Sequence, residues 1–577
     1  MQSSTVSSCV IGESGSFSGH CRGIFSIFSI AAWPLLSAQS YIIGQAFGVT
    51  YAPLPQTIYD GKTLDKKQYP VLIIGAGPAG LSAAYELVTR GVEPLVLEGG
   101  NRVGGISRTE EYHGFRFDIG GHRFLTKDRA ISQLWKQMLG PDFRRVPRLS
   151  RIYYKHKYYD YPLNLLNTLS NLGLGESLLI LLSYLKARLR PKSEETTFQQ
   201  WVSNRFGWRL YHTFFKTYTE KVWGIPCSQI QAEWAVQRIR DLSVTEVIGD
   251  ALFGNSRAKS LVHEFDYPTL GPGMMWERFQ QAIESGGGTV RLGAKVVGMK
   301  HTDSRITAAI VRINDREEQI AAEQFISSMP LAQLVQQLDP PAPPEVRRAA
   351  QGLKYRDLIV VGLIAHCTDS FPDNWIYVHN PDVQVGRIQN FARWSGAMVP
   401  DPGWTSLGME YFSNEGDTLW SMSDQELIDL AKREIQLLDL AQGTDIVDGL
   451  VIRQPKAYPV YDPTYKANLA TIQRYLSTFT NLQTVGRNGL HHYNNQDHSM
   501  ITGILAARNL LGECHDVWSV NTDEAYLEEQ VSEQTTLSRP VSALWATRPS
   551  MIVTWPIGHV GRATASEARR AQSTKAQ

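Results

Sequence analysis

Three closely spaced glycines and an acid that follows them have the residue types and spacing that bind a dinucleotide. The segment reads Gly75-Ala76-Gly77-Pro78-Ala79-Gly80, and the acid is Glu98. In this pattern the first glycine makes a tight turn and the second lets the backbone approach a pyrophosphate. The third lets a helix pack closely on a strand, and the acid accepts ribose hydroxyls. These residues predict a nucleotide-binding site.

The flanking residues predict the elements that position this turn. Val71–Ile74 is a short apolar run typical of a buried parallel strand. Residues 81–90 have helical periodicity and stop at Gly91, and Pro94–Leu97 is a second apolar run. Strand, glycine-rich turn, helix, strand and acid in about 30 residues form one βαβ unit, whose helix directs its N-terminus toward the phosphates.

The residues after the acid distinguish among the possible dinucleotides. They read Glu98-Gly99-Gly100-Asn101-Arg102-Val103-Gly104-Gly105. Arg102 can neutralise pyrophosphate charge, and Gly104 with Gly105 lets the chain pass close to a cofactor. The segment resembles the E-x-x-x-R-x-G-G motif of the flavoprotein superfamily of amine oxidases, protoporphyrinogen oxidases and UDP-galactopyranose mutases. This resemblance implies FAD as the cofactor.

Further motifs, in the same order along residues 70 to 515, resemble those of the UDP-galactopyranose mutases. They include Phe117-Asp118-Ile119-Gly120-Gly121-His122, Tyr161-Pro162, Lys221-Val222-Trp223-Gly224, Gly486-Arg487 and Asn495-Gln496-Asp497-His498-Ser499-Met500. The resemblance implies that His122 lies beside the flavin ring and that Val296 contacts the adenine side. It also implies flavin contacts from the C-terminal motifs, through Gly486, Arg487, Asp497, Ser499 and the backbone N–H of Met500.

The same resemblance implies a site for a substrate diphosphate. Its residues would be Arg387, Lys216, Tyr458 and Tyr493. The chain departs from the family pattern at two of these positions. Lys216 stands where the family has an arginine, so the bidentate fork is lost. Trp394 stands where the family has a tyrosine, and an indole can donate a hydrogen bond but not accept one. Lys216 also suits a solvated surface position.

Three classes of function remain open from the sequence. The first is a mutase-like isomerase that acts on a UDP-sugar through reduced flavin N5. The second is an FAD-dependent oxidoreductase of the amine oxidase, protoporphyrinogen oxidase or desaturase type. The third is a non-enzymatic protein similar to GDP-dissociation inhibitors, against which the complete glycine and acid pattern argues. The central and C-terminal motifs favour the first.

The predicted fold is α/β, with a discontinuous Rossmann-type FAD-binding domain and an inserted substrate domain of helices and an antiparallel sheet. We assign residues 70–150, 260–335 and 476–515 to the FAD domain and 151–259 and 336–475 to the substrate domain. Residues 1–69 form a leader, and 516–577 form a C-terminal extension. Leu174–Leu189 is predicted as a leucine-rich helix that either fills a core or contacts a membrane.

Bulk composition points to a small-molecule partner. The 577 residues carry a net charge of +1, which gives no electrostatic reason to expect nucleic acid. The five scattered cysteines form no metal-type spacing, and no metal site is predicted. We expect a cytoplasmic protein. The uncharged stretch from Gly23 to Tyr59 is too broken for a spanning helix, but a signal segment or membrane contact remains an alternative.

Overall fold

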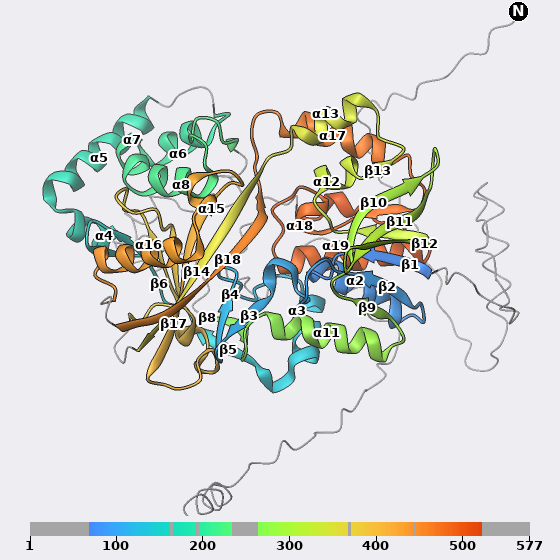
Figure 1. The fold of residues 1–577 in the computed structure, drawn as a ribbon. Helices are drawn as coiled ribbons and strands as arrows, with labels where there is room; N and C mark the ends of the chain where they lie inside the picture. Colours follow the sequence, from blue (N-terminus) through green and yellow to red (C-terminus); the bar gives the residue numbers. More distant parts are fainter. Residues whose placement is uncertain are drawn as a thin grey trace, which may run out of the picture. The chain divides into compact units, whose positions relative to one another are not determined.

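The computed structural model describes residues 69–161, 165–190, 195–232, 264–366, 371–441 and 445–521. Of the leader predicted over residues 1–69, only Tyr69 lies within these ranges, where it begins the first strand, and the tail beyond residue 521 lies outside them. Two large sheets organise the described chain (Figure 1). This arrangement confirms the predicted α/β fold class, with a parallel dinucleotide-type sheet and a second, largely antiparallel sheet.

The first sheet is built around the predicted βαβ unit. Its strands are β1 (Tyr69–Ile74), β2 (Pro94–Leu97), β9 (Thr289–Arg291), β10 (Lys295–His301), β11 (Ile306–Ile313), β12 (Arg316–Ser327), β13 (Leu338–Asp339) and β19 (Leu482–Thr484). Strand β1 pairs in parallel with β2 on one side and with β12 on the other. Strands β10, β11 and β12 pair antiparallel. Parallel strands buried on both faces explain the unbroken apolar runs.

Helices cover both faces of the first sheet. One core lies under α2 (Pro78–Val88), α3 (Arg129–Leu139), α11 (Gly273–Ser285) and α19 (Gln496–Leu510). The other lies under α12 (Leu331–Gln336), α13 (Pro344–Gln351) and α17 (Tyr465–Leu476). Helices α13 and α17 fall within the segment predicted for the substrate domain, yet their apolar side chains pack in the core of the first sheet.

Helix α2 begins three residues earlier than its periodicity predicted. Gly77 is its N-cap, and Pro78 occupies the first helical position. Proline is well suited there because its fixed φ matches the helix and its missing N–H would have no helical partner. The glycine turn therefore leads directly into the helix.

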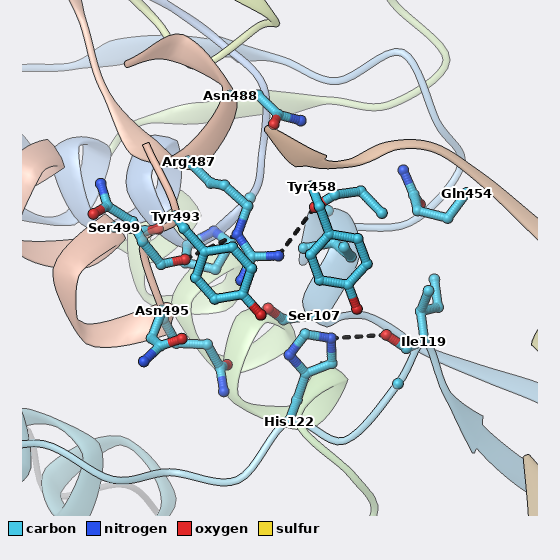
Figure 2. A pocket seen from close by; sticks show the side chains of 18 of the residues that line it. Ser107, Ile119, His122, Gln454, Tyr458, Arg487, Asn488, Tyr493, Asn495 and Ser499 are labelled. Atoms are coloured by element: carbon cyan, nitrogen blue, oxygen red, sulfur yellow. Dashed lines mark hydrogen bonds between the residues drawn. The ribbon is translucent and has the colours of Figure 1, made fainter. Parts of the chain in front are cut away.

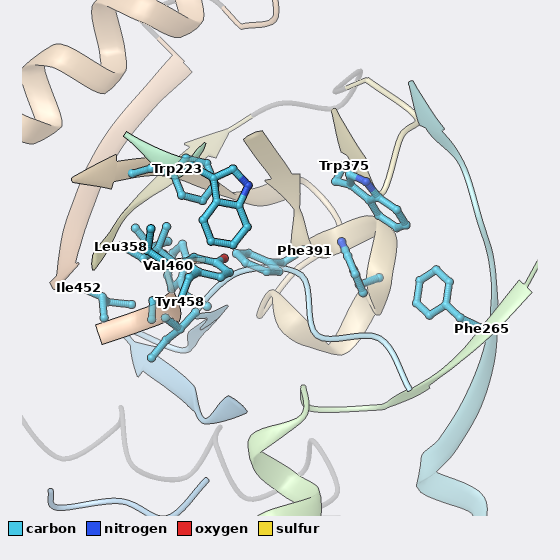
Figure 3. Close-up of a cluster of buried hydrophobic side chains, with 14 of the residues drawn as sticks. Trp223, Phe265, Leu358, Trp375, Phe391, Ile452, Tyr458 and Val460 are labelled. Carbon is cyan, nitrogen blue, oxygen red and sulfur yellow. The ribbon is translucent and has the colours of Figure 1, made fainter. Parts of the chain in front are cut away.

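The second sheet is mostly antiparallel. Its strands are β6 (Ser150–Tyr154), β7 (Lys157–Asp160), β14 (Tyr355–His366), β15 (Trp375–Val378), β16 (Arg387–Asn390), β17 (Trp404–Ser413) and β18 (Ile446–Pro459). Among the described strands of this second sheet, β15 and β6 form the only parallel pair. One face packs against α16 (Asp424–Leu437), whose N-cap is Ser423. The other face carries an aromatic cluster that includes Trp223, Phe391 and Tyr458 (Figure 3).

A helical part adjoins the second sheet (Figure 1). It contains α4 (Leu165–Leu172), α5 (Leu174–Leu189), α6 (Phe198–Phe206), α7 (Trp208–Leu210) and α8 (Thr217–Trp223). A π-helical turn, Tyr211–Lys216, joins α7 to α8. Two small hairpin-like pairs, β3 (Thr109–Tyr112) with β4 (Phe115–Asp118) and β5 (Phe143–Pro147) with β8 (Glu264–Pro268), complete the described strands. Within the described ranges, no helix has the length and apolarity to cross a bilayer.

Candidate active site

One cavity of about 720 Å³ is lined by residues of both sheets. Volumes of this order are typical of ligand and cofactor sites. Most of the residues predicted from the sequence line it: Gly75, Gly77, Pro78, Ala79, Glu98, Gly99, Gly105, His122, Val296, Arg387, Tyr458, Gly486, Arg487, Tyr493, Asp497 and Ser499. The structure therefore gathers the nucleotide motif and the C-terminal motifs around a single space.

The turn after β1 can be built only with glycine. Gly75 has φ +95°, and a Cβ on it would lie 2.2 Å from Ser328 Oγ. A Cβ on Gly80 would lie 1.9 Å from the carbonyl oxygen of Gly75. Helix α2 therefore packs against the turn at a distance that excludes any side chain at Gly80. Gly80 supports the cavity from behind and does not line it.

Glu98 connects the end of β2 to the glycine turn. One carboxylate oxygen accepts a hydrogen bond from the Ala76 N–H at 2.8 Å, and the other accepts one from the Gly100 N–H at 2.8 Å. Because Glu98 also lines the cavity, its carboxylate is held where it can meet the hydroxyls of a ribose.

Three other predicted cofactor residues lie outside the cavity lining. Gly104 has φ +105°, and its N–H donates to the Ala76 carbonyl oxygen, so it shapes the turn from behind. Arg102 is 41% exposed and faces Glu110 at 3.6 Å. Met500 is buried inside α19, where its sulfur lies 3.0 Å from Trp135 Nε1. The structure does not bring the side chain of Arg102 to the site, whereas the prediction for Met500 concerns its backbone N–H and stays a prediction.

His122 stands on the loop after β4, at the junction of the two sheets' contributions to the cavity (Figure 2). Its Nε2–H donates to the Ile119 carbonyl oxygen at 2.9 Å, which assigns the proton of the neutral ring to Nε2. Burial, followed by the positive charge of Arg487, lowers the pKa of His122 to about 3. The imidazole is therefore neutral at physiological pH.

Arg387 forms a buried ion pair across the second sheet. Its Nε donates to Glu410 Oε1 at 2.8 Å, and its Nη2 contacts the second carboxylate oxygen. Glu410 is fully buried, and Gln389 Nε2 donates to it at 2.7 Å. The sequence analysis did not identify Glu410. Its charge offsets that of Arg387, so this wall presents an oriented guanidinium without a net positive charge.

Two tyrosines and an arginine form a stacked group beside His122 (Figure 2). The rings of Tyr458 and Tyr493 stack with centroids 5.7 Å apart, and the Arg487 guanidinium lies 4.7 Å from the Tyr493 ring centroid. Arg487 also donates to the carbonyl oxygens of Asn494 and Ala457. Burial raises the pKa of Tyr458, so its hydroxyl is a donor throughout the physiological range. The group combines π faces with hydroxyl donors.

Two residues tied to the diphosphate prediction do not take the expected part. Lys216 ends the π-helical turn, lies outside the cavity lining and faces Glu220 at 3.7 Å. Lys216 therefore fits the alternative prediction of a solvated surface lysine better than that of a diphosphate ligand. Trp394 does line the cavity, but its indole N–H donates to the Asn374 carbonyl oxygen at 2.8 Å. Its one donor is therefore already used.

The remaining wall of the cavity is aromatic. Phe214 and Phe215 come from the π-helical turn, which is a conformation often found at functional sites. Tyr218 stacks on His379 with centroids 4.9 Å apart. Trp375 and Tyr377 come from β15. Sequence reasoning did not identify these residues, because an aromatic side chain in a helix or strand is usually part of a core.

Several buried amides at the C-terminal end of the cavity have polar atoms without a protein partner. Among the described residues these atoms include Asn488 Oδ1, Asn494 Nδ2 and Gln496 Oε1, and all three residues line the cavity. Buried polar groups normally have hydrogen-bond partners, so unpaired amides facing a cavity indicate a polar ligand there. The glycine turn at one end and these amides at the other fit an elongated dinucleotide with a hydrogen-bonding ring system.

Fold and site together define a dinucleotide-binding enzyme of the flavoprotein type. The chain belongs to the flavin containing amine oxidoreductase family, whose model matches residues 78–448. It is 33% identical over 111 residues to L-amino acid oxidase bordonein-L of Crotalus durissus terrificus, which is 19% of this chain and 22% of that protein. The chain thus spans only about a fifth of the length of the curated relatives it matches.

Solved structures show the same fold at lower identity. Reduced UDP-galactopyranose mutase superposes with a TM-score of 0.69 at 21% identity, covering 79% of this chain and 96% of the mutase chain. Putrescine oxidase bound to putrescine gives a TM-score of 0.52 at 17% identity, covering 78% and 100% of the two chains. The protein is an FAD-dependent flavoenzyme of the amine oxidase type. When bound, FAD supplies the redox and nucleophilic chemistry of its ring.

Acid sensitivity is expected to depend on His122. Its unfolded-state pKa lies near 6.5 and its folded-state pKa is about 3. The unfolded chain therefore binds more protons below pH 6.5, and the stability associated with neutral His122 is lost progressively as the pH falls from 6.5 toward 3. Urea unfolding from pH 7 to pH 5 should show a smaller loss of stability for His122→Asn than for the wild type. Equal losses in the two proteins would contradict this assignment.

Proposed function

We propose that this flavoenzyme acts on a nucleotide sugar, as a UDP-galactopyranose mutase does. The observation that carries the proposal is the common position of Arg387, Tyr458 and Tyr493 near His122 in one cavity. His122 interacts electrostatically with Arg387 and Arg487, and Tyr458 interacts with both arginines and with Tyr493. Two guanidinium groups and two hydroxyls thus lie around the space next to His122, where the family resemblance of the motifs around His122 and Arg487 implies the flavin ring.

This set suits a reaction in which a diphosphate leaves a sugar. Negative charge develops on the leaving oxygen, and oriented cations and hydroxyl donors stabilise it. Reduced flavin supplies the nucleophilic N5 for such a reaction. In this proposal Tyr458 and Tyr493 donate to the diphosphate, and Arg387 orients it. His122 is neutral, and its ring is held by the hydrogen bond to the Ile119 carbonyl oxygen. In this proposal it contacts the sugar and does not form an ion pair with the diphosphate.

A second candidate is the oxidation of an apolar or amine-bearing substrate. Two observations favour it. Glu410 offsets the charge of Arg387, and Lys216 lies outside the cavity lining. The aromatic wall would then bind the substrate by its apolar surface. The curated relatives include L-amino-acid oxidases, although the match covers about a fifth of their length.

Titration of the reduced, FAD-loaded protein with UDP distinguishes the two candidates. We expect UDP to perturb the flavin absorbance spectrum. Tyr493→Phe should raise the Kd for UDP, taken from this spectral change, about tenfold or more. The reason is that a hydrogen bond to a charged group contributes roughly 1.5–3 kcal/mol. Tyr475→Phe, on α17 and outside the cavity lining, is the matched control and should bind UDP as the wild type does.

Conversion of UDP-galactopyranose to the furanose by the reduced protein would complete the test. If UDP leaves the wild-type spectrum unchanged while an amine or amino acid reduces the flavin of the oxidised protein, the nucleotide-sugar proposal is wrong and the second candidate stands. Cytoplasmic location stays a prediction from the sequence and is part of the same proposal, since nucleotide sugars are the substrates expected there.

A further inference from the structure

Helix α5 carries an apolar face that the described protein leaves uncovered. This leucine face consists of Leu174, Leu178, Leu181, Leu182, Leu185 and Leu189. Their exposed fractions run from 43% to 92%. At 100° per residue these six positions fall within one stripe about 100° wide, and Leu179, also 44% exposed, lies about 60° beyond one edge of it. Figure 1 shows α5 on the outer side of the helical part. An exposed stripe of this kind differs from scattered single leucines and indicates an interaction surface.

The opposite face of α5 fixes this orientation. Tyr184 is buried, and a Cβ on Gly207 would lie 2.7 Å from the Tyr184 backbone nitrogen, so the helix backbone lies directly on the turn between α6 and α7. Arg209 makes two hydrogen bonds to the Glu176 carboxylate, at 2.6 and 2.7 Å. The helix could not turn its leucines inward without breaking these contacts. The apolar stripe therefore points outward as part of the fold.

Charges around the leucine face have one sign. Lys186, Arg188 and Arg190 are exposed. At 100° per residue Lys186 and Arg188 fall at the two edges of the stripe, and Arg190 follows the last residue of the helix. The acidic residue of α5, Glu176, is on the opposite face and is paired with Arg209. A leucine stripe with basic residues at its edges is the pattern of a helix that lies in a membrane interface.

We propose that α5 docks this protein on the surface of an anionic lipid bilayer. The leucine face would enter the boundary between headgroups and acyl chains, and the three basic residues would contact anionic headgroups. With 16 residues, α5 is about 24 Å long and would lie in the membrane plane. A second copy of the chain is a weaker candidate, because two such faces would bring their basic borders together. This proposal does not depend on the proposed function.

Vesicle flotation of the full-length, FAD-loaded protein tests the proposal. We expect binding to phosphatidylcholine vesicles that contain phosphatidylglycerol, and at least roughly tenfold weaker binding to phosphatidylcholine alone. The combined variant Leu178→Glu, Leu182→Glu and Leu185→Glu should lose flotation. Leu437→Glu is the matched control, since Leu437 is a 62% exposed leucine on α16 and does not belong to the leucine face of α5, and it should float as the wild type does.

Two further measurements keep the outcomes distinct. The variant Lys186→Glu with Arg188→Glu leaves the leucines in place and should lose the preference for anionic vesicles, and flavin content reports whether each variant is folded. The proposal is overturned if the wild type does not float with anionic vesicles. It is equally overturned if sedimentation shows a dimer that the triple leucine variant converts to a monomer while vesicle binding is absent, because the face would then be an interface between copies.

Discussion

Gly80→Ala is expected to yield colourless protein that does not take up added FAD. The new methyl group would lie 1.9 Å from the Gly75 carbonyl oxygen and 3.1 Å from the Gly75 carbonyl carbon. These are backbone atoms of the turn itself, so relief requires α2 to move away from β1. That movement displaces the helix N-terminus and the turn that together bind the pyrophosphate. The ratio of flavin absorbance to protein absorbance in the purified protein measures the effect.

A second glycine controls for the general effect of adding a methyl group. Gly396 has no atom within 4 Å of its Cβ position and needs no left-handed backbone. Gly396→Ala should therefore retain full FAD content and the wild-type melting temperature. If Gly80→Ala binds FAD as well as Gly396→Ala does, the glycine turn does not hold the cofactor, and the assignment of this site fails.

Arg387→Met is expected to reduce the free energy of unfolding by about 3–5 kcal/mol. Removal of one partner of a buried ion pair leaves the other charge without compensation, and costs of this size are typical. Glu410 is fully buried and would keep only the hydrogen bond from Gln389. Urea unfolding of the FAD-loaded proteins, followed by circular dichroism, gives the comparison.

The double variant identifies the cause. Arg387→Met with Glu410→Gln removes both charges, and we expect it to recover most of the lost stability, because a neutral amide is far less costly to bury than a carboxylate. A double variant as unstable as Arg387→Met would mean that the arginine stabilises the fold through contacts other than Glu410. The double variant is also the better probe of substrate binding, since loss of UDP binding by Arg387→Met alone could reflect a disturbed sheet.

The nucleotide end of the site was predictable because its determinants are local. One strand, one turn, one helix and one acid lie within about 30 residues, and each residue type has a steric or electrostatic reason at its position. The structure brings Gly75, Gly77 and Glu98 to the cavity, as this reasoning requires. The N-cap at Ser423 was predictable for the same reason, since its partner is Glu426 in the next turn.

The substrate end was decided by tertiary structure. Arg387 meets Glu410 because the two residues are directly opposite in the register of β16 and β17, which a loop of unpredictable path separates in sequence. Because of this register, Arg387, which the sequence predicted as a free cation at the substrate site, forms an ion pair with no net charge. Lys216 is the last residue of a π-helical turn, and its side chain does not reach the cavity that Tyr218, two residues later, does line.

The sequence by itself therefore determined the fold class, the FAD-binding turn and the presence of a leucine-rich helix. Only the tertiary structure decided which charges face the cavity and which face of that helix meets solvent. Periodicity along a chain reports that apolar residues share a face, but the contacts of Tyr184 and Glu176 decide that the leucines of α5 point outward. The physical reason is that burial and charge pairing depend on residues distant in sequence.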